Sequence, residues 1–310
     1  ALAYKSTASF LGACPSKSYI LSNTDFTTAI NSYLGLPIPL LRDRVGTRIP
    51  HTGSSPLLLD PHGDNLTKST SILGNNTKRR HDGFLTVLSD MLRTAKIDHT
   101  SEDIETFSAS RTDPTNPFPP LIPDLTIPRA GTRILHDLKF IGTGASIFDL
   151  GGEGIAIETR AARVNTEYVA KAASHDAANR FSRTSDTLKK SGTVRGLVVG
   201  PRGELSKDLQ SLVRQAASKA AHENWRRLGK ESSQLARADY LRIFTKKLAI
   251  AGIRAQASWL AGRYEQAIAQ MAGAAAPDKR ARDQDRRARH ESEEYWSANA
   301  GFARADFRTQ

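Results

Sequence analysis

Hydrophobic positions follow a helical repeat most clearly in KRRHDGFLTVLSDMLRTAKI, residues 78–97. Apolar side chains recur there at three- and four-residue spacing, while charged side chains take the other faces. The apolar face is formed by Phe84, Leu85, Leu88, Met91 and Leu92. This pattern predicts an amphipathic helix that packs on a core.

Three short runs have the composition of β-strands. DLTI (124–127) and RILHDLKFIG (133–142) are separated by PRAGT, whose proline and glycine suit a hairpin turn. A third run, TVRGLVVG (193–200), is rich in β-branched residues. Helical composition fills residues 156–190 and dominates from 204 to about 273. The pattern as a whole predicts an α/β protein with a mostly helical C-terminal region.

The other segments are less regular. DFTTAINSYLG (25–35) predicts a short helix, with Asp25 or Thr24 as its N-cap. Residues 51–76 are dense in Gly, Pro, Ser, Thr and Asn and predict loop or small irregular structure. Residues 98–123 turn acidic and then proline-rich, which favours a loop. The mixed-charge tail from Pro277 is typical of a solvated or disordered helix.

Charge is unevenly distributed along the 310 residues, whose formal net charge is +12. Residues 1–150 hold 15 Lys/Arg against 14 Asp/Glu, whereas residues 151–310 hold 29 against 18. A basic half suits a polyanionic partner, although basic surfaces also occur on proteins that bind no nucleic acid. No apolar run is long enough to cross a bilayer, and the first residues lack the pattern of a signal peptide. We therefore expect a nuclear or cytoplasmic protein that is neither secreted nor membrane-bound.

Candidate chemistry lies within PDLTIPRAGTRILHDLK, residues 123–139. Residues two apart in a strand point to the same face, so Asp137 and Lys139 share a face, with Leu138 on the other. A hairpin can bring Asp124 beside them. Two carboxylates can hold Mg²⁺, and a lysine can orient a water molecule or offset charge on a phosphate. The same residues could instead form an ordinary exposed cross-strand pair.

The Pro-Asp, spacer, Asp-x-Lys arrangement resembles the PD-(D/E)XK, or restriction-endonuclease-like, superfamily. More narrowly, residues 20–215 resemble the restriction-like endonuclease region at the carboxyl end of reverse transcriptases of non-LTR retrotransposons. The segments that carry the resemblance are LSNTDFTTAINSYLGLPIP, LDPHGDNLTKS, RRHDGFLTVLSDMLRTAKI, LIPDL, ILHDLKF and TVRGLVVGPRGELSKDLQSLVRQ. The resemblance implies a restriction-endonuclease-like mixed sheet flanked by helices. It also implies Asp124 and Asp137 as metal ligands and Lys139 as the catalytic lysine.

Four further residues receive roles from the resemblance alone. Glu102 falls near the place of an additional acidic metal ligand, with Glu105 as a rival, and both could also be solvated charges at a helix start. Arg80 and His81 match an Arg-His pair in the family's helix. That pair would either contact nucleic acid near the substrate phosphate or be an ordinary pair at a helix start.

One departure from the family concerns zinc. The family's knuckle usually carries Cys and His residues spaced to hold zinc, and a structural zinc site needs four such ligands. This chain has Asn65 where the histidine would stand and Ser69 where the following cysteine would stand, and its single cysteine is Cys14. His51 and His62 cannot complete a zinc site by themselves. We therefore expect Mg²⁺ but no zinc, and either a decayed element copy or a loop that folds without metal.

Three functions follow as hypotheses. The first is a Mg²⁺-dependent DNA endonuclease domain of a retrotransposon reverse transcriptase, which nicks target DNA to prime reverse transcription. Its partners would be DNA, possible element RNA, and a reverse transcriptase domain upstream in the same polyprotein. The second is a catalytically inactive nucleic-acid-binding remnant, and the third is an α-rich interaction protein. The expected divisions are an N-terminal helix and degenerate knuckle (1–76), a nuclease-like domain (77–215) and a basic helical region with a charged tail (216–310).

Overall fold

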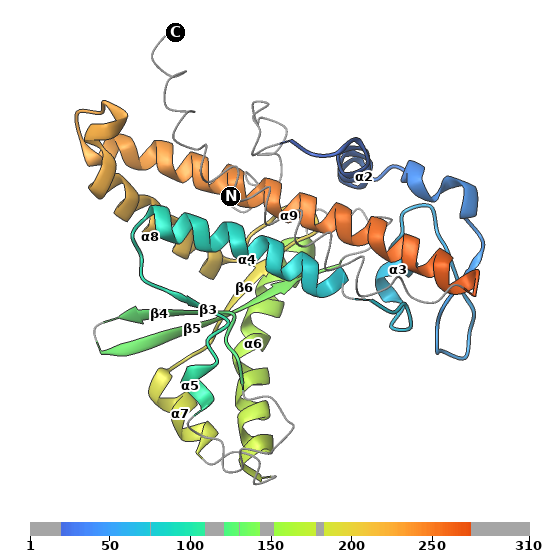
Figure 1. The fold of residues 1–310 in the computed structure, drawn as a ribbon, viewed down its shortest axis with the longest axis horizontal. Helices are drawn as coiled ribbons and strands as arrows, with labels where there is room; N and C mark the ends of the chain where they lie inside the picture. The colour runs from blue at the N-terminus through green and yellow to red at the C-terminus, as the bar shows by residue number, and fades with distance from the viewer. Residues whose placement is uncertain are drawn as a thin grey trace.

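The computed structural model is an α/β protein with a four-stranded mixed sheet, a small two-stranded sheet and a mostly helical C-terminal part (Figure 1). This agrees with the predicted fold class at that level of detail. The structure describes residues 20–74, 76–108, 121–129, 131–142, 152–177 and 183–273. The tail from Pro277 lies outside the described residues. Within the described ranges, no helix combines the length and apolar character needed to cross a membrane.

The larger sheet has the strand order β3-β4-β5-β6. Neighbours are antiparallel from β3 to β5, with Leu125 opposite His136, whereas β6 runs parallel to β5, with Leu138 beside Leu197. The strands are β3 (Thr100–Ser101), β4 (Leu125–Arg129), β5 (Thr132–Phe140) and β6 (Arg195–Val199). The predicted hairpin and third strand are confirmed, while β3 was not predicted.

The turn of the hairpin is tighter than the PRAGT segment suggested. Pro128 and Arg129 still belong to β4, and Thr132 already belongs to β5. Gly131, between the strands, has φ +82°, a backbone region that favours glycine because a Cβ atom would be strained there. The tight turn fixes the register that places the start of β4 opposite His136, in the middle of β5.

Helices α4 (Asn76–Thr94) and α8 (Lys207–Asn224) cover one face of the sheet, and α9 (Ser233–Met271) packs across both (Figure 1). The predicted apolar face of the helix at 78–97 is confirmed, because all five of its residues are buried in this core. The core also takes in Leu138 of β5 and Leu197 of β6. The short 3-10 helix η3 (Arg226–Leu228) connects α8 and α9. The predicted helical region after residue 204 is therefore confirmed as far as the description extends.

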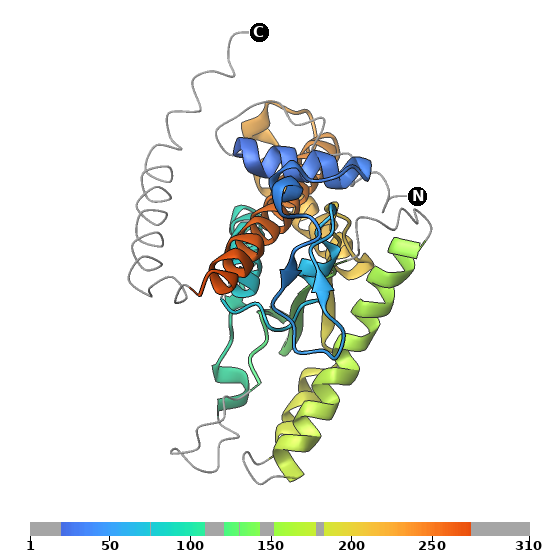
Figure 2. The ribbon, with the colours of Figure 1, turned by 90° about the vertical axis from the view of Figure 1, so that its right-hand side faces the viewer.

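The opposite face is covered by α6 (Gly152–Ala177) and α7 (Thr184–Ser191), and Figure 2 shows α6 running along the molecule. Its core joins Leu135 of β5 with Val164 and Tyr168 of α6. The short helix α5 (Glu105–Ser108) contributes the buried Phe107 to the same cluster. At Gly196 of β6 the strand lies so close to α6 that an added Cβ atom would be 2.6 Å from the carbonyl oxygen of Ala161.

The N-terminal elements pack on the C-terminal half of α9 (Figures 1 and 2). They are α2 (Asn23–Leu34), η2 (Pro39–Arg44), β1 (Arg48–Ile49), β2 (Leu57–Leu58) and α3 (Asp64–Lys68). The expected N-cap of the first helix was wrong. Ser22, rather than Asp25 or Thr24, is the N-cap, and its hydroxyl accepts a hydrogen bond from the Asp25 backbone N–H. Gly35 ends the helix in the left-handed conformation, at the predicted position.

Hydrogen bonds organise the knuckle segment internally. The Asp60 carboxylate accepts backbone N–H bonds from His62, Asp64 and Asn65 at 2.7–3.1 Å. The Asn65 side-chain amide donates to the carbonyl of Leu58 at 2.8 Å. A carboxylate that accepts several backbone N–H groups fixes the turn leading into α3. Asn65, which stands at the expected histidine position, therefore ties the turn to β2.

Two further residues tie the knuckle segment to its surroundings. The Ser69 hydroxyl donates to the carbonyl of Pro50 at 2.5 Å. The buried Arg263 guanidinium of α9 donates to the carbonyls of Leu66, at 2.9 Å, and of Ser69. Ser69, at an expected cysteine position, is thus joined both to the end of the small sheet and to α9. Hydrogen bonds between the chain's own polar groups therefore hold the knuckle segment in place.

Candidate active site

Asp124 and the Asp137–Lys139 segment meet where β4 begins beside β5, the two middle strands of the larger sheet. Asp124 immediately precedes β4, and Asp137 and Lys139 lie in the second half of β5. The Asp124 Oδ2 atom accepts the backbone N–H of Leu138 at 2.5 Å. Leu138 lies between Asp137 and Lys139 in the chain. This bond therefore places the Asp124 carboxylate next to both residues. The structure therefore brings together the three residues expected to form the site.

Asp137 and Lys139 form an ion pair. The Lys139 Nζ atom lies 2.5 Å from Asp137 Oδ2, and the two side chains are 31% and 6% exposed, respectively. Leu138 points to the opposite face and is buried in the core under α4 and α8. The alternation expected from the strand pattern thus exists in β5. The Lys139 side chain is exposed enough to contact a ligand, whereas the Asp137 side chain is buried.

His81 reaches the same site from α4. Its Nε2 atom lies 3.0 Å from Asp124 Oδ2, and its Nδ1 atom lies 3.2 Å from Asp82 Oδ1. Burial alone would lower the pKa of His81, but hydrogen bonds and charges from Asp124 and Asp82 raise it overall. Two flanking carboxylates therefore favour the imidazolium form, which balances the charge of Asp124.

Tyr168 of α6 approaches from the face of the sheet opposite α4, the face to which the Asp137 side chain also points. Its hydroxyl lies 3.1 Å from Asp137 Oδ1 and 3.1 Å from the carbonyl oxygen of Ile122, and it can donate its hydrogen to either. Burial, together with the charges of Asp137 and Asp124, raises the pKa of the Tyr168 phenol. The phenol therefore stays protonated and acts as a hydrogen-bond donor that orients Asp137.

The two carboxylates differ in acidity. Burial alone would raise the pKa of Asp124, but the hydrogen bond and charge of His81, the Leu138 N–H and the charge of Lys139 lower it overall. Burial and the negative charge of Asp124 raise the pKa of Asp137, against the attraction of Lys139. Neighbouring carboxylates with diverging acidities are common where a protein binds a cation or transfers a proton.

The donors present fit a magnesium ion. Mg²⁺ is commonly held by one or two carboxylates, with water and substrate phosphate oxygens completing its coordination. Asp124 and Asp137 provide two carboxylates, and Asp137 Oδ2 lies against the Lys139 ammonium. Among the described residues, no three or more His, Cys, Asp and Glu side chains group in a way that could hold a metal ion. The described donors therefore suit a site in which the carboxylates of Asp124 and Asp137 share one ion.

Of the acidic residues expected to add a ligand, Glu102 is joined to Asp124 through the backbone, and no described contact joins Glu105 to the site. Glu102 is exposed, with φ +50°, and its backbone N–H donates to the carbonyl of Asp124 at 3.0 Å. Glu105 is exposed at the start of α5. The described contacts of Glu102 thus position the Asp124 backbone, and its role as a metal ligand stays a prediction. Asp103, between them in sequence, is buried and accepts bonds from the Thr106 backbone and hydroxyl.

Arg80 is part of the packing between α4, β5 and α9. Its guanidinium carbon lies 4.7 Å from the ring centre of Phe140 and 4.2 Å from that of Trp259. One guanidinium nitrogen donates to Gln256 Oε1 at 2.9 Å. Burial, with the charge of Arg263, lowers the pKa of Arg80 to about 10. These contacts are structural, and a contact with nucleic acid stays a prediction for Arg80 and for its neighbour His81.

Sequence reasoning missed two features of the site. Tyr168 was not considered, although Val164, Tyr168 and Ala172 recur at four-residue spacing and form a buried face of α6. A tyrosine on such a face, where its hydroxyl needs a partner, was the available signal. His81 was expected near a phosphate, but its partner Asp124 lies 43 residues away and only the folded chain joins them.

Comparison with protein-family models finds no family that matches the chain, and a search of curated proteins finds no match either.

Proposed function

We propose that this chain is a restriction-endonuclease-like, Mg²⁺-dependent DNA endonuclease domain. The observation that carries the proposal is the meeting of Asp124, Asp137 and Lys139 at the start of β4, through the Leu138 N–H and the Asp137–Lys139 ion pair. The mixed sheet with helices on both faces is compatible with such a fold. The resemblance of the Pro-Asp and Asp-x-Lys segments to the PD-(D/E)XK superfamily suggests the reaction class, hydrolysis of a phosphodiester.

Each residue has a role that follows from its surroundings. Asp124 and Asp137 would hold Mg²⁺, which when bound polarises a scissile phosphodiester and favours deprotonation of a water molecule. Lys139, half-buried beside Asp137, offsets negative charge that develops on the phosphate or orients the attacking water. Tyr168 is a positioning residue, because it contacts Asp137 rather than the substrate. His81 neutralises Asp124 when no other cation is beside it.

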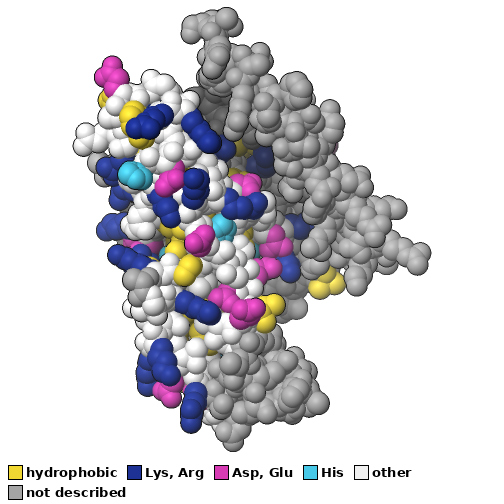
Figure 3. All heavy atoms as spheres, turned by 60° about the vertical axis from the view of Figure 1, so that its left-hand side comes forward, with side chains coloured by type: hydrophobic (Ala, Val, Ile, Leu, Met, Phe, Trp, Pro, Cys, Tyr) yellow, Lys and Arg dark blue, Asp and Glu magenta, His cyan; other side chains and the backbone are white. Residues whose placement is uncertain are grey.

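Basic helices would position the duplex. Lys and Arg side chains are distributed over the whole length of the face shown in Figure 3, with acidic side chains among them. Arg226 and Arg227 in η3 and Lys247 in α9 are exposed. Contacts with backbone phosphates fix a protein on DNA without reading its sequence. As a group, these residues are therefore candidates for sequence-independent binding to the DNA backbone.

The biological role rests on the resemblance to non-LTR retrotransposon reverse transcriptases. In that setting the domain nicks chromosomal DNA, and the free 3′ end primes reverse transcription by a polymerase domain of the same polyprotein. Target DNA and element RNA are the corresponding partners. The C-terminal basic half suits contact with either polyanion.

Relaxation of supercoiled plasmid DNA tests the proposal. The wild-type chain is expected to nick the plasmid with Mg²⁺ and not with EDTA, while Asp137→Ala and Lys139→Met lower the rate by about a hundredfold or more. Lys190→Met, which removes an exposed lysine of α7, is the matched control and should leave the rate unchanged. Nicking that persists equally in Asp137→Ala would contradict the assignment.

A second candidate is a nucleic-acid-binding domain without cleavage. Two observations favour it: the knuckle departs from the family pattern, and both carboxylates already have cationic partners in His81 and Lys139. Salt-dependent binding to duplex DNA, with a wild-type chain that fails to nick in Mg²⁺ or Mn²⁺, would select this function over the first.

A further inference from the structure

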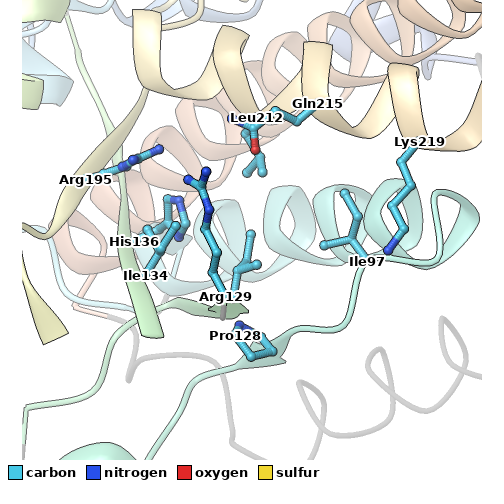
Figure 4. A pocket seen from close by; sticks show the side chains of 10 residues that line it. Ile97, Pro128, Arg129, Ile134, His136, Arg195, Leu212, Gln215 and Lys219 are labelled. Carbon is cyan, nitrogen blue, oxygen red and sulfur yellow. The ribbon is translucent and has the colours of Figure 1, made fainter. Parts of the chain in front are cut away.

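A second candidate site lies on the other face of the sheet. Figure 4 shows a cavity of about 230 Å³ between the β4–β5 hairpin, the start of β6 and α8. His136 lines it from β5, and because His136 is adjacent to Asp137 in a strand, the two side chains point to opposite faces. The cavity is therefore separate from the candidate active site.

Three cations from three different elements line the cavity. Arg129 comes from the end of β4, Arg195 from the start of β6 and Lys219 from α8, and the described residues of the lining include no Asp or Glu. In Figure 4 the Arg129 and Arg195 side chains extend toward each other beside His136. Among the described residues, neither arginine forms an ion pair. Guanidinium groups directed at the same space repel, and an anion between them removes the repulsion.

His136 provides an unused polar atom at the base of the cavity. The residue is 2% exposed, and its Nδ1 atom has no hydrogen-bond partner. A buried polar atom without a partner normally marks a place where a ligand or water binds. An imidazole nitrogen can serve as a hydrogen-bond donor or acceptor for a bound molecule.

The remaining walls are apolar. Ile97, Ile127 and Leu212 line the cavity beside the cationic groups. A simple inorganic anion would gain nothing from these side chains, whereas the ring of a base or sugar can pack on them. The lining therefore combines a cationic part that suits a phosphate with an apolar part that suits a nucleoside.

We propose that this cavity binds a nucleoside phosphate, with Arg129 and Arg195 on the phosphate and the isoleucine and leucine walls on the nucleoside. Bidentate guanidinium contacts are well suited to phosphate oxygens. The ligand is either a free nucleotide or the phosphorylated end of a single strand, because both present the same group. The inference does not rest on the proposed nuclease activity, since the cavity and its residues lie across the sheet from Asp137.

Binding without cleavage tests the inference. Fluorescence anisotropy in EDTA compares a labelled single-stranded decamer that carries a 5′-phosphate with the same decamer lacking it. The phosphorylated strand is expected to bind about tenfold more tightly, the effect of about one charge-assisted contact. Arg195→Gln should remove this preference, and Arg163→Gln, which removes an exposed arginine of α6 on the other face, should retain it.

A second variant distinguishes loss of the binding site from misfolding of the Arg195→Gln protein. Gln215 is exposed on α8 and lines the cavity, so Gln215→Glu adds a negative charge without disturbing the core. It should also abolish the preference while leaving the melting temperature unchanged. A wild-type chain with no preference for the phosphorylated strand, or a preference that survives both Arg195→Gln and Gln215→Glu, would overturn the inference.

Competition identifies the source of the ligand. Displacement of the phosphorylated decamer by deoxyadenosine monophosphate, and not by inorganic phosphate, supports a free nucleotide as ligand. Displacement only by unlabelled phosphorylated strand supports a strand end. Equal displacement by inorganic phosphate and deoxyadenosine monophosphate would show that the apolar walls do not contribute, and would contradict the nucleoside assignment. The preference should also be unchanged in Asp137→Ala, whatever that variant does to cleavage.

Discussion

At the residue scale, the candidate active site consists of two carboxylates that each have a cationic neighbour. Lys139 stands two positions after Asp137 in the same strand, so the pairing follows from strand geometry alone. Asp124 is paired with His81 of α4, and this contact depends on tertiary structure. The arrangement limits the repulsion that two buried carboxylates would otherwise experience. In the proposed function, the same carboxylates would exchange these partners for a divalent ion.

Tyr168→Phe tests whether the phenol orients Asp137. Loss of the hydroxyl removes a donor to Asp137 Oδ1 and should lower the rate of Mg²⁺-dependent nicking about ten- to hundredfold, because a hydrogen bond to a charged group contributes about 1.5–3 kcal/mol. Raising the Mg²⁺ concentration should restore part of the rate, since the variant weakens the placement of a ligand. Tyr240→Phe in α9 is the control, and a Tyr168→Phe rate equal to that of the control would exclude the positioning role.

Residue-scale prediction from sequence succeeded where the relevant geometry is local. The shared face of Asp137 and Lys139 follows from the two-residue period of a strand, and the approach of Asp124 follows from a hairpin. His81 and Tyr168 come from helices on opposite sides of the sheet, and their approach depends on how those helices pack. Periodicity indicates which face of a helix is buried but not which distant carboxylate that face will meet.

At the element scale, α7 begins without a conventional cap. Its N-cap residue, Arg183, is in the left-handed conformation and provides no side-chain cap. Asp176, from the end of α6, instead accepts the backbone N–H groups of Thr184 and Ser185 at 2.8 and 2.9 Å. Burial alone would raise the pKa of Asp176, but the hydrogen bonds from Ser185 and Thr184 together lower it below its ordinary value of 3.8. The carboxylate thereby joins the end of one helix to the start of the next.

Asp176→Ala should destabilise the protein by about 1–2 kcal/mol at pH 7, as loss of a strong helix cap does. Because the folded-state pKa of Asp176 is lowered, its contribution is fully present above the ordinary value of 3.8 and is lost as the pH falls through the folded-state pKa. Urea unfolding should therefore give a constant difference from wild type between pH 5 and 8 and a smaller one below about pH 4.

Asp186→Ala is the control for this cap. Asp186 lies in the first turn of α7 and contacts Lys189 at 3.7 Å, with both side chains exposed. Its loss should cost only about 0.3–1 kcal/mol, through the helix dipole. If Asp176→Ala were no more destabilising than Asp186→Ala at pH 7, the capping role would be excluded.

Elements with strong local patterns were predictable, and those set by tertiary pairing were not. The five buried residues of α4 and the β4–β5 hairpin follow from helical and strand periodicity. The two residues of β3 lie in an acidic segment and become a strand only because Thr100 pairs with Thr126 of β4. A two-residue strand carries no period of its own, so its pairing partner alone defines it.

At the scale of the whole molecule, α9 connects the parts of the fold. This 39-residue helix packs on α4 and α8 through Phe244 and Leu248 and on α2 through Ile250 and Ile253. Its C-terminal half then meets the knuckle segment through Arg263. The sequence predicted helix and excess positive charge in this region. It did not predict these contacts, because the buried residues shift from one face of α9 to another as its neighbours change.

Arg263→Met tests the connection between α9 and the knuckle segment. The variant keeps the apolar stem but leaves the buried carbonyls of Leu66 and Ser69 without their donor, which should cost about 1–3 kcal/mol. Amide hydrogen exchange in residues 60–69 should accelerate more than exchange in β5. Arg237→Met, an exposed position on the same helix, should change stability by less than about 0.5 kcal/mol. Unchanged exchange in residues 60–69 would contradict the anchoring role.

Metal binding measured directly gives the sharpest test of the proposal that Asp124 and Asp137 share a divalent ion. Mn²⁺ is a suitable reporter because carboxylate and water ligands accept it much as they accept Mg²⁺. Titration followed by electron paramagnetic resonance should find a Mn²⁺ site in the wild-type chain that is competed by Mg²⁺ and lost in Asp124→Asn/Asp137→Asn. Equal Mn²⁺ binding by the wild type and the double variant would contradict a metal site at the start of β4.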